Sequence, residues 1–191
     1  ASRTAKGVPL VNLVALSDGE KVTAAIPIPD FEAADYLLLA TKRGRVKRVA
    51  LAEFASVRPS GLIAMNLDGG DELGWVALTH GPQEIIMGSS RGRALRFSVN
   101  TVRPMGRAAS GVNAMRFKGD DHVASMGVVD PEADLLIVTA NGYGKRTALS
   151  EFTVKGRRGQ GIWAIANRKL KEIGPIVDTK VVTDKDEVTL I

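Results

Sequence analysis

A strand–turn–strand pattern recurs three times along this 191-residue chain, and the repeat limits the folds that the chain can adopt. In the third copy, the apolar run 134–139 reaches an Asn141-Gly142 turn and returns through the basic pair Lys145-Arg146. An Asn-Gly pair between two strand-like runs is a strong signal for a tight β-hairpin. The turn glycines lie 48 and 50 residues apart, at Gly44, Gly92 and Gly142. A repeat of this length indicates a modular architecture of similar units.

Each hairpin is preceded by two further segments of alternating apolar character, so one unit holds four short strands. Alternation with a period of two predicts strands, and Asp-Gly pairs between them predict tight turns. First strands are predicted at 7–13, 61–67, 111–117 and 161–167, and second strands at 21–26, 72–78 and 122–128. Third strands are predicted at 37–40, 85–87 and 135–139, with 187–191 as the last copy.

The units run approximately over 7–60, 61–110, 111–160 and an incomplete 161–191, within one domain spanning 1–191. Four-stranded repeats of this length predict an all-β, propeller-like fold of antiparallel blades. A long β-sandwich is the alternative, but a sandwich does not require a repeat. The segment 30–35 is expected to be a longer inter-strand loop, or a helical turn capped by Asp30.

Catalytic, metal-binding and membrane-spanning roles find no support in the composition. The chain has no cysteine and only two histidines, which leaves no thiolate nucleophile and no cysteine-ligated metal site. No phosphate-binding loop precedes a helix, and no Ser–His–acid spacing is present. No apolar run approaches the roughly 18 residues of a spanning helix. We therefore predict no catalytic residue, no cofactor, no metal and no membrane partner. A start at Ala1 without methionine suggests an excised fragment.

Positive charge is segregated along the repeat, although the net charge is only +5. No acidic residue occurs within 36–52, 85–119 or 152–171, and these stretches hold most of the cations. Equivalent positions in a repeat lie on equivalent sides of each blade, so the cations are expected to form a curved basic belt. The candidate belt residues are Lys42, Arg43, Arg45, Lys47, Arg48, Arg91, Arg93, Arg96, Arg103, Arg107, Lys145, Arg146, Lys155, Arg157 and Arg158.

A curved basic belt suits duplex DNA, whose phosphates bind Arg and Lys with release of counterions. No recognition helix and no aromatic platform is visible, which favours binding through the backbone with little sequence preference. Two alternatives stay open. Charged residues on an outer strand also prevent strand pairing between molecules. Arg48, Arg96 and Arg146, at equivalent positions, can instead hold carbonyl groups of the blade or the preceding acidic loop.

The segment 141–147, together with Ser150-Glu-Phe152, is similar to the C-terminal domain of bacterial DNA gyrase A. The segments 7–13, 19–22, 69–73 and 90–97 share the resemblance, which covers essentially the whole chain. It implies a β-pinwheel, a propeller variant in which a hairpin of one repeat invades the neighbouring blade. It also implies an outer rim that wraps duplex DNA and biases strand passage toward negative supercoiling. The nucleophilic tyrosine of the family lies in another domain.

The chain departs from the family pattern in two respects. It holds fewer repeats than the family's domain, and it lacks the signature box Gln-Arg-Arg-Gly-Gly-Lys-Gly. The segment 155–161 has a similar composition in another order and is interpreted as an inter-blade loop. If each hairpin pairs with the first two strands of the next unit, three blades are complete. The remaining end strands then close a ring or lie at open edges, depending on whether Val11 and Leu190 meet.

The function expected from residues and resemblance together is that of a non-catalytic, DNA-wrapping domain of a type IIA topoisomerase. The resemblance implies duplex DNA, the remainder of gyrase A and the companion protein gyrase B as partners. It also implies a cytoplasmic, nucleoid-associated location in bacteria. The equivalent domain of topoisomerase IV is one alternative. A propeller-like scaffold for protein interactions, without DNA binding, is the other.

Overall fold

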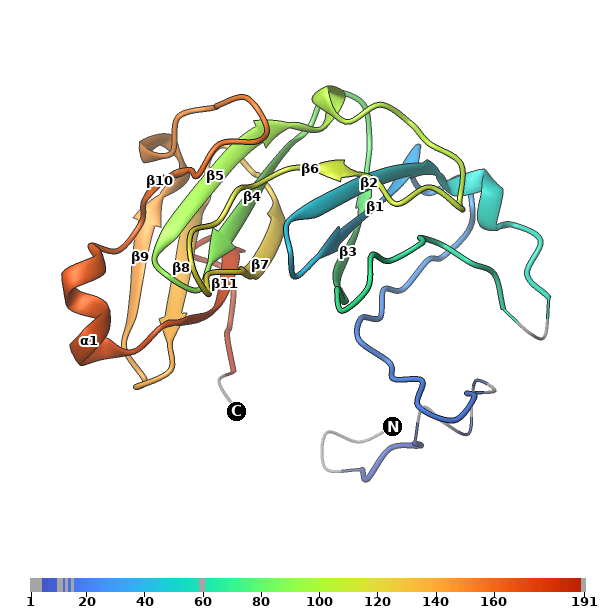
Figure 1. Ribbon diagram of the computed structural model, residues 1–191, viewed down its shortest axis with the longest axis horizontal. Helices are drawn as coiled ribbons and strands as arrows, with labels where there is room; N and C mark the ends of the chain where they lie inside the picture. The colour runs from blue at the N-terminus through green and yellow to red at the C-terminus, as the bar shows by residue number, and fades with distance from the viewer. Residues whose placement is uncertain (1–4, 10–11, 13, 15, 59–60, 190–191) are drawn as a thin grey trace.

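The computed structural model describes residues 5–9, 12, 14, 16–58 and 61–189, and its strands form three antiparallel sheets (Figure 1). The strand orders are β3-β1-β2-β6, β10-β5-β4-β7 and β11-β8-β9. We call them the first, second and third sheet. The strands are β1 (Tyr36–Thr41), β2 (Arg45–Ala50), β3 (Leu73–Thr79), β4 (Glu84–Ser89), β5 (Arg93–Ser98), β6 (Val112–Asn113), β7 (Val123–Val128), β8 (Asp134–Thr139), β9 (Gly144–Ala148), β10 (Ile162–Trp163) and β11 (Ile176–Val182).

The three repeated hairpins are confirmed as β1–β2, β4–β5 and β8–β9. The first two hairpins form the two central strands of their sheets, and β8–β9 forms the centre and one edge of the third sheet. Their turn glycines all have positive φ, between 81° and 89°. Glycine adopts this conformation without the steric penalty that a β-carbon brings. The repeated hairpins therefore form at the positions where a turn glycine follows an apolar run in the sequence.

One unit contributes strands to three different sheets, which differs from the expected pairing with the next unit alone. The third unit gives β6 to the first sheet, β7 to the second and the β8–β9 hairpin to the third. Each hairpin thus receives its second-strand partner from the next unit and its first-strand partner from the unit after that. Among the described residues, two four-stranded blades are complete, not three, because no first strand pairs with β9 in the third sheet.

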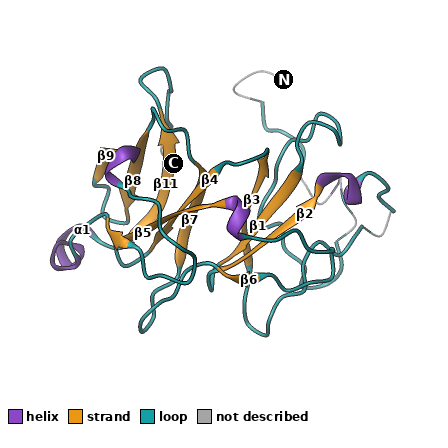
Figure 2. Cartoon of the chain, turned by 90° about the horizontal axis from the view of Figure 1, so that it is seen from above, coloured by secondary structure: helices purple, strands orange, loops and turns teal. Residues whose placement is uncertain are grey.

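The second strands of the units form the centre of the molecule. β7 contacts both β3 and β11, and each of these three strands lies at one edge of its own sheet. Figure 1 shows the three sheets side by side in an arc, with β3, β7 and β11 close together in the middle. Seen from above in Figure 2, the sheets stand next to one another as successive blades. The opposite edges, formed by β6, β10 and β9, are therefore the outer rim.

Apolar residues fill both spaces between neighbouring sheets. Leu38 on one face of β1 packs with Ile85 and Phe97 between the first and second sheets. Ile86, on the other face of β4, packs with Leu135 between the second and third sheets. Alternate residues of a strand point to opposite faces, so an unbroken apolar run buries both faces at once. A third cluster, which includes Leu37 and Leu39, covers the outer face of the first sheet.

Four predicted strands differ from the structure. Residues 21–26 and 61–67 form no strand, and neither do 7–9 of the predicted strand 7–13. In the later units such segments pair with a hairpin of an earlier unit, and the described residues before β1 form no hairpin for these to join. Residues 186–189 also form no strand, whereas 10, 11, 13, 190 and 191 lie outside the described residues. The closure hypothesis, which depends on Val11 and Leu190, stays untested for that reason.

Where the structure describes the chain, helical structure is limited to short turns. They are η2 (Leu51–Phe54), η3 (Val99–Thr101), η4 (Leu149–Glu151), η5 (Asn167–Lys169) and α1 (Leu170–Ile173). The segment 30–35 contains turns and bends but no helix, as the loop interpretation expects. α1 occupies the place in the last unit where earlier units have an acidic turn, and it was not predicted. Within the described part of the chain, no helix is long and apolar enough to cross a membrane.

Candidate nucleic-acid interface

The cations at the tips of the first two hairpins are neutralised by the acidic turn of the following unit. Lys42 Nζ lies 2.9 Å from Glu72 Oε2, and Arg45 Nε lies 2.9 Å from Asp68 Oδ2. Arg43 donates from Nη1 to the Gly69 carbonyl at 2.9 Å. In the second hairpin, Arg91 Nη2 donates to Asp120 at 2.6 Å. A phosphate at these tips would have to displace a carboxylate and would then be repelled by it.

In the Arg91–Asp120 pair, each side chain shifts the pKa of the other. The hydrogen bond from Arg91 lowers the pKa of Asp120, and the same bond raises the pKa of Arg91. Both side chains therefore keep their charges at neutral pH and bind each other. The pair is exposed, so its contribution to stability is small.

Lys47 does not belong to the basic belt, because its side chain is fully buried, with 0% exposure. The ammonium group donates to the carbonyl oxygens of Ala64, at 2.7 Å, and of Arg107. Burial lowers the pKa of Lys47, and the charge of Glu53 partly offsets that effect. Lys47 thus fixes the segment around Ala64 against the first sheet and cannot reach a DNA phosphate.

Arg48 and Arg96 also hold the protein together rather than face solvent. Arg96 donates from Nη1 to the Leu149 carbonyl at 2.7 Å, and its Nη2 lies 2.6 Å from Glu84 Oε2. Arg48 donates to Asn100 Oδ1 at 3.1 Å and stacks over the Tyr36 ring. These contacts agree with the structural alternative considered from the sequence. Because these contacts engage both side chains, we no longer count Arg48 and Arg96 among the proposed DNA contacts.

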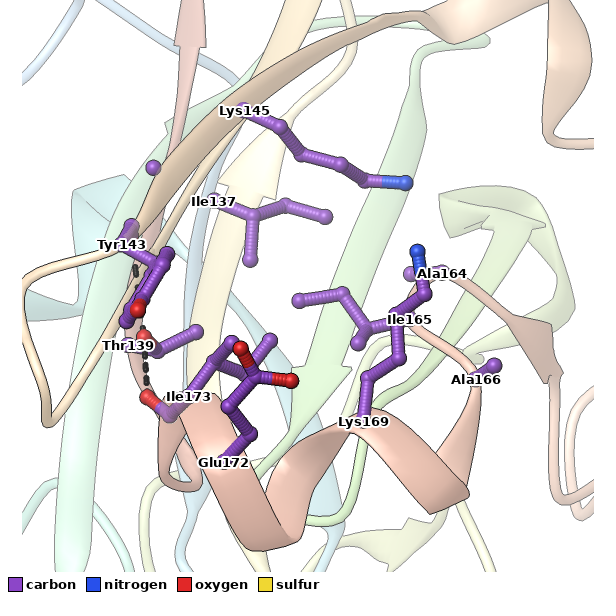
Figure 3. A pocket seen from close by; sticks show the side chains of 11 residues that line it. Ile137, Thr139, Tyr143, Lys145, Ala164, Ile165, Ala166, Lys169, Glu172 and Ile173 are labelled. Carbon is purple, nitrogen blue, oxygen red and sulfur yellow. Dashed lines mark hydrogen bonds between the residues drawn. The ribbon is translucent and has the colours of Figure 1, made fainter.

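Lys145 and Arg146 lie on β9, the strand without a neighbour at the outer rim. Arg146 binds Asp134 at 2.7 Å and Asp184 at 2.8 Å, and these two acids raise its pKa. Lys145 lines a cavity of about 390 Å³ between β9 and the segment 164–173. Figure 3 shows the Lys145 and Lys169 amines reaching into it from opposite sides. Thr139 closes one end through a hydrogen bond to the Ile173 carbonyl at 2.6 Å.

The segment 153–161, called the strap from here on, runs along the outer rim and joins the second blade to the first. Lys155 N donates to the Arg96 carbonyl at 2.8 Å, and Arg158 N donates to the Ala114 carbonyl at 2.6 Å. Arg157 spans the Thr101 and Asn113 carbonyls, both at 2.8 Å. Burial, followed by the nearby charge of Arg158, lowers the pKa of Arg157. The inter-blade loop interpretation of 155–161 is confirmed.

Several cations without an acidic partner lie on and beside the strap. Arg158 has a φ of 70°, and it is the one non-glycine residue with positive φ in the described ranges. Arg107 lies 4.0 Å from Glu53, a long and weak pairing. Among the residues that the structure describes, the cations in this region that pair with no carboxylate include Arg103, Arg116, Lys118, Lys155 and Arg158.

A second cavity, of about 350 Å³, lies between the first two blades beside the strap, and we call it the seam pocket. Arg93, from the candidate set, stacks over the Trp163 ring with its Cζ 3.9 Å from the ring centroid. The pocket is lined by Arg91, Arg93, Arg116, Lys118, Asp120, Asp121, Gln160, Trp163 and Asn167. The candidate set missed Arg116, Lys118 and Trp163. The available signal was a tryptophan at an outward-facing position of an alternating strand.

The sequence comparison agrees with this geometry. The family described as "DNA gyrase C-terminal domain, beta-propeller" matches residues 1–29, 35–79, 83–130 and 133–183. The chain belongs to this family. The resemblance stated from the residues is therefore confirmed, as is the all-β fold of four-stranded antiparallel blades. The domain is the non-catalytic part of the enzymes that carry it, and no cluster of metal-ligating side chains occurs in the described ranges.

Relatives of the gyrase C-terminal domain family resemble the chain over its full length. The DNA gyrase A protein of Salmonella typhimurium is 42% identical over 191 residues, which is 100% of this chain and 22% of that protein. A solved DNA gyrase A C-terminal domain has a TM-score of 0.81 at 27% identity, covering 94% of this chain and 60% of that one. The C-terminal domain of DNA topoisomerase IV gives 0.83 at 29% identity, covering 92% and 55%.

Proposed function

We propose that this chain is the DNA-binding and DNA-wrapping domain of a gyrase A protein, and that it binds duplex DNA through the phosphate backbone. The observation that carries the proposal is the location of the unpaired cations. Several of them lie on or beside the strap, and the strap joins one blade to the next through the Arg158 N to Ala114 O hydrogen bond. A duplex following the rim therefore meets positive charge continuously across a blade boundary.

The proposed contact residues are fewer than the sequence suggested. They are Arg93, Arg103, Arg107, Lys145, Lys155, Arg157 and Arg158, with Arg116 and Lys118 added. Arginine binds phosphate with two parallel hydrogen bonds, and lysine acts as a point charge. Lys42, Arg45, Arg91 and Arg146 already pair with carboxylates. Arg43 binds the acidic turn that also neutralises Lys42 and Arg45, so the contribution of all five to DNA binding is proposed to be small.

A salt titration of duplex affinity tests the proposal. Fluorescence anisotropy of a labelled duplex measures the dissociation constant at each salt concentration. The logarithm of the binding constant is expected to fall linearly with the logarithm of the salt concentration, at a slope of about −0.9 for each phosphate contacted. Absence of binding at low salt contradicts the proposal and favours the protein-interaction scaffold.

Within the full enzyme, we propose that the domain works with the rest of gyrase A and with gyrase B, on chromosomal DNA in the bacterial cytoplasm. Wrapping at the rim then directs strand passage toward negative supercoils. Ligation of nicked plasmid bound to the chain, followed by measurement of its linking number, tests this step. A change of linking number in proportion to bound protein supports wrapping, and an unchanged value contradicts it. The handedness of the change separates this assignment from a topoisomerase IV domain that does not wrap in the same sense.

A further inference from the structure

We infer that the seam pocket between the first two blades is a binding site for the nucleic-acid backbone in which the indole of Trp163 contacts the sugar next to a bound phosphate. This inference rests on the proposed function and names a site within it. The pocket has a volume of about 350 Å³ and combines three kinds of lining residue: cations, amides and one aromatic ring.

The acids of the pocket are already occupied, which leaves its cations available. Asp120 binds Arg91 at 2.6 Å. Asp121 accepts hydrogen bonds from Ser89 Oγ at 2.8 Å, from Ser90 Oγ at 3.0 Å and from the Arg91 amide at 2.9 Å. Arg93, Arg116 and Lys118, by contrast, pair with no carboxylate in the described part of the chain. With Asp120 and Asp121 also counted, the four cations that line the pocket leave it with a net charge of +2.

Trp163 lies on β10, the outermost strand of the second sheet, and 49% of its surface is exposed. Arg93 is held over the ring by its stacking contact and by a hydrogen bond to the Gly161 carbonyl at 3.1 Å. The equivalent residue of the first sheet is Asn113, also exposed, so the blade itself does not require an aromatic side chain there. Arg93, the cross-strand neighbour of Trp163, covers part of the ring, and the exposed remainder is available to a ligand.

The combination fits a phosphodiester backbone better than a free anion. The guanidinium groups and Lys118 supply donors for phosphate oxygens, and the amides of Gln160 and Asn167 supply donors for ester or sugar oxygens. The indole adds an apolar surface that inorganic phosphate cannot use but a deoxyribose ring can. The pocket also lies beside the strap, where a duplex on the rim passes from one blade to the next.

Tryptophan emission tests the inference, because the chain has only two tryptophans. Trp75 packs against the core between the first and second sheets, so Trp75→Phe leaves Trp163 as the reporter. We expect the emission of this variant to change on titration with a duplex, along the same isotherm as duplex anisotropy. Trp163→Phe is the matched control, and its emission is expected to stay constant. If Trp75→Phe does not fold, the difference between native and Trp163→Phe titrations gives the same signal.

The duplex affinity of point variants provides a second test of the seam pocket. Trp163→Ala is expected to weaken duplex binding about tenfold, within the range seen for aromatic side chains stacked on nucleic acid. The salt slope stays unchanged in that variant, whereas Arg116→Gln and Lys118→Gln each reduce it by about 0.9.

Three outcomes overturn the inference, and they differ from one another. Duplex binding without any change in Trp163 emission removes the seam pocket but keeps the proposed function. The same emission change with inorganic phosphate, at a similar concentration of phosphate groups, makes the pocket an anion site without a role for the sugar. Absence of duplex binding at low salt removes both the pocket and the proposed function.

Discussion

Arg96 reaches from β5 of the second sheet to the carbonyl oxygen of Leu149, 2.7 Å away, at the start of the 3-10 helix that ends the third hairpin. The same guanidinium binds Glu84, and the side chain of Arg96 is only 12% exposed. Neighbouring blades are thus joined by a charge-assisted hydrogen bond as well as by apolar contact. The residue looked like part of a DNA-binding row in the sequence, yet it stabilises the boundary between blades.

Loss of this contact is expected to destabilise the domain. Arg96→Met removes the hydrogen bonds to Leu149 and leaves Glu84 without its partner, at a cost of about 2–3 kcal/mol. Urea denaturation followed by circular dichroism measures the loss. Arg146→Met is the control, since it occupies the equivalent position at the open edge, and we expect a clearly smaller effect there. Equal losses in the two variants would contradict a blade-joining role for Arg96.

Lys47 is expected to make the free energy of unfolding depend on pH in the alkaline range. Its folded pKa is lowered below the ordinary value of 10.5, so between the two pKa values the unfolded chain binds more protons than the folded chain. The unfolding free energy therefore rises with pH in that window. Lys47→Leu, which copies the equivalent Leu95, is expected to abolish this rise. Lys145→Leu, at the exposed equivalent position, is expected to retain it. A native-like rise in the Lys47→Leu variant would refute the assignment.

Because Arg158 has a strained backbone conformation, we expect Arg158→Gly to increase the stability of the domain and to weaken its binding to duplex DNA. Arg158→Gly removes a β-carbon from a residue with φ of 70° and is expected to stabilise the domain by about 0.5–1 kcal/mol. The same change removes one phosphate contact, so the salt slope of duplex binding falls by about 0.9.

The control for Arg158 is its repeat equivalent. Ala108 has no positive φ, so Ala108→Gly is expected to destabilise the domain by about 0.4–1 kcal/mol. A gain in stability at Ala108 would contradict the strain assigned to Arg158. Unchanged duplex binding by Arg158→Gly would remove Arg158 from the proposed contact residues.

Gly161 controls the position of the strand that carries Trp163. A β-carbon at Gly161 would lie 2.3 Å from the Ala94 carbonyl oxygen, whereas Gly142, with a similar φ, faces open space. Gly142→Ala therefore measures the cost of φ alone, about 1–2 kcal/mol. Gly161→Ala is expected to cost a further 1–3 kcal/mol or so from overpacking. Thermal unfolding compares the two, and equal losses would mean that β10 moves aside without strain.

The hairpins were predictable because their signals are local. A glycine with positive φ and an alternating apolar run lie within a few residues of each other at Gly44, Gly92 and Gly142. The distribution of each unit's strands over three sheets was not predictable, because an apolar strand can form backbone hydrogen bonds with the edge of any hairpin. Local sequence does not encode which edge it joins.

The ion pairs and burial within the predicted basic belt were not predictable, for a related reason. Arg91 and Asp120 are separated by 29 residues, so their contact depends on how successive units stack. Lys47 and Lys145 occupy equivalent positions, but one is buried under the segment around Ala64 and the other faces a cavity. Charge reversal at Lys47 or Arg96 would therefore unfold the domain and say little about DNA. We propose instead that the strap and the segment 116–118 carry the charge that contacts DNA.

Two triple variants, compared in the duplex salt titration, test the location of the DNA-binding surface most directly. One neutralises the rim with Arg103→Gln, Arg116→Gln and Arg158→Gln, and the other neutralises the hairpin tips with Lys42→Gln, Arg43→Gln and Arg91→Gln. Both remove the same charge. We predict that the rim variant lowers the salt slope by about 2.7 while the tip variant lowers it by less than about 0.9. A tip variant that loses the larger share, with a rim variant that binds like the native chain, would contradict the account.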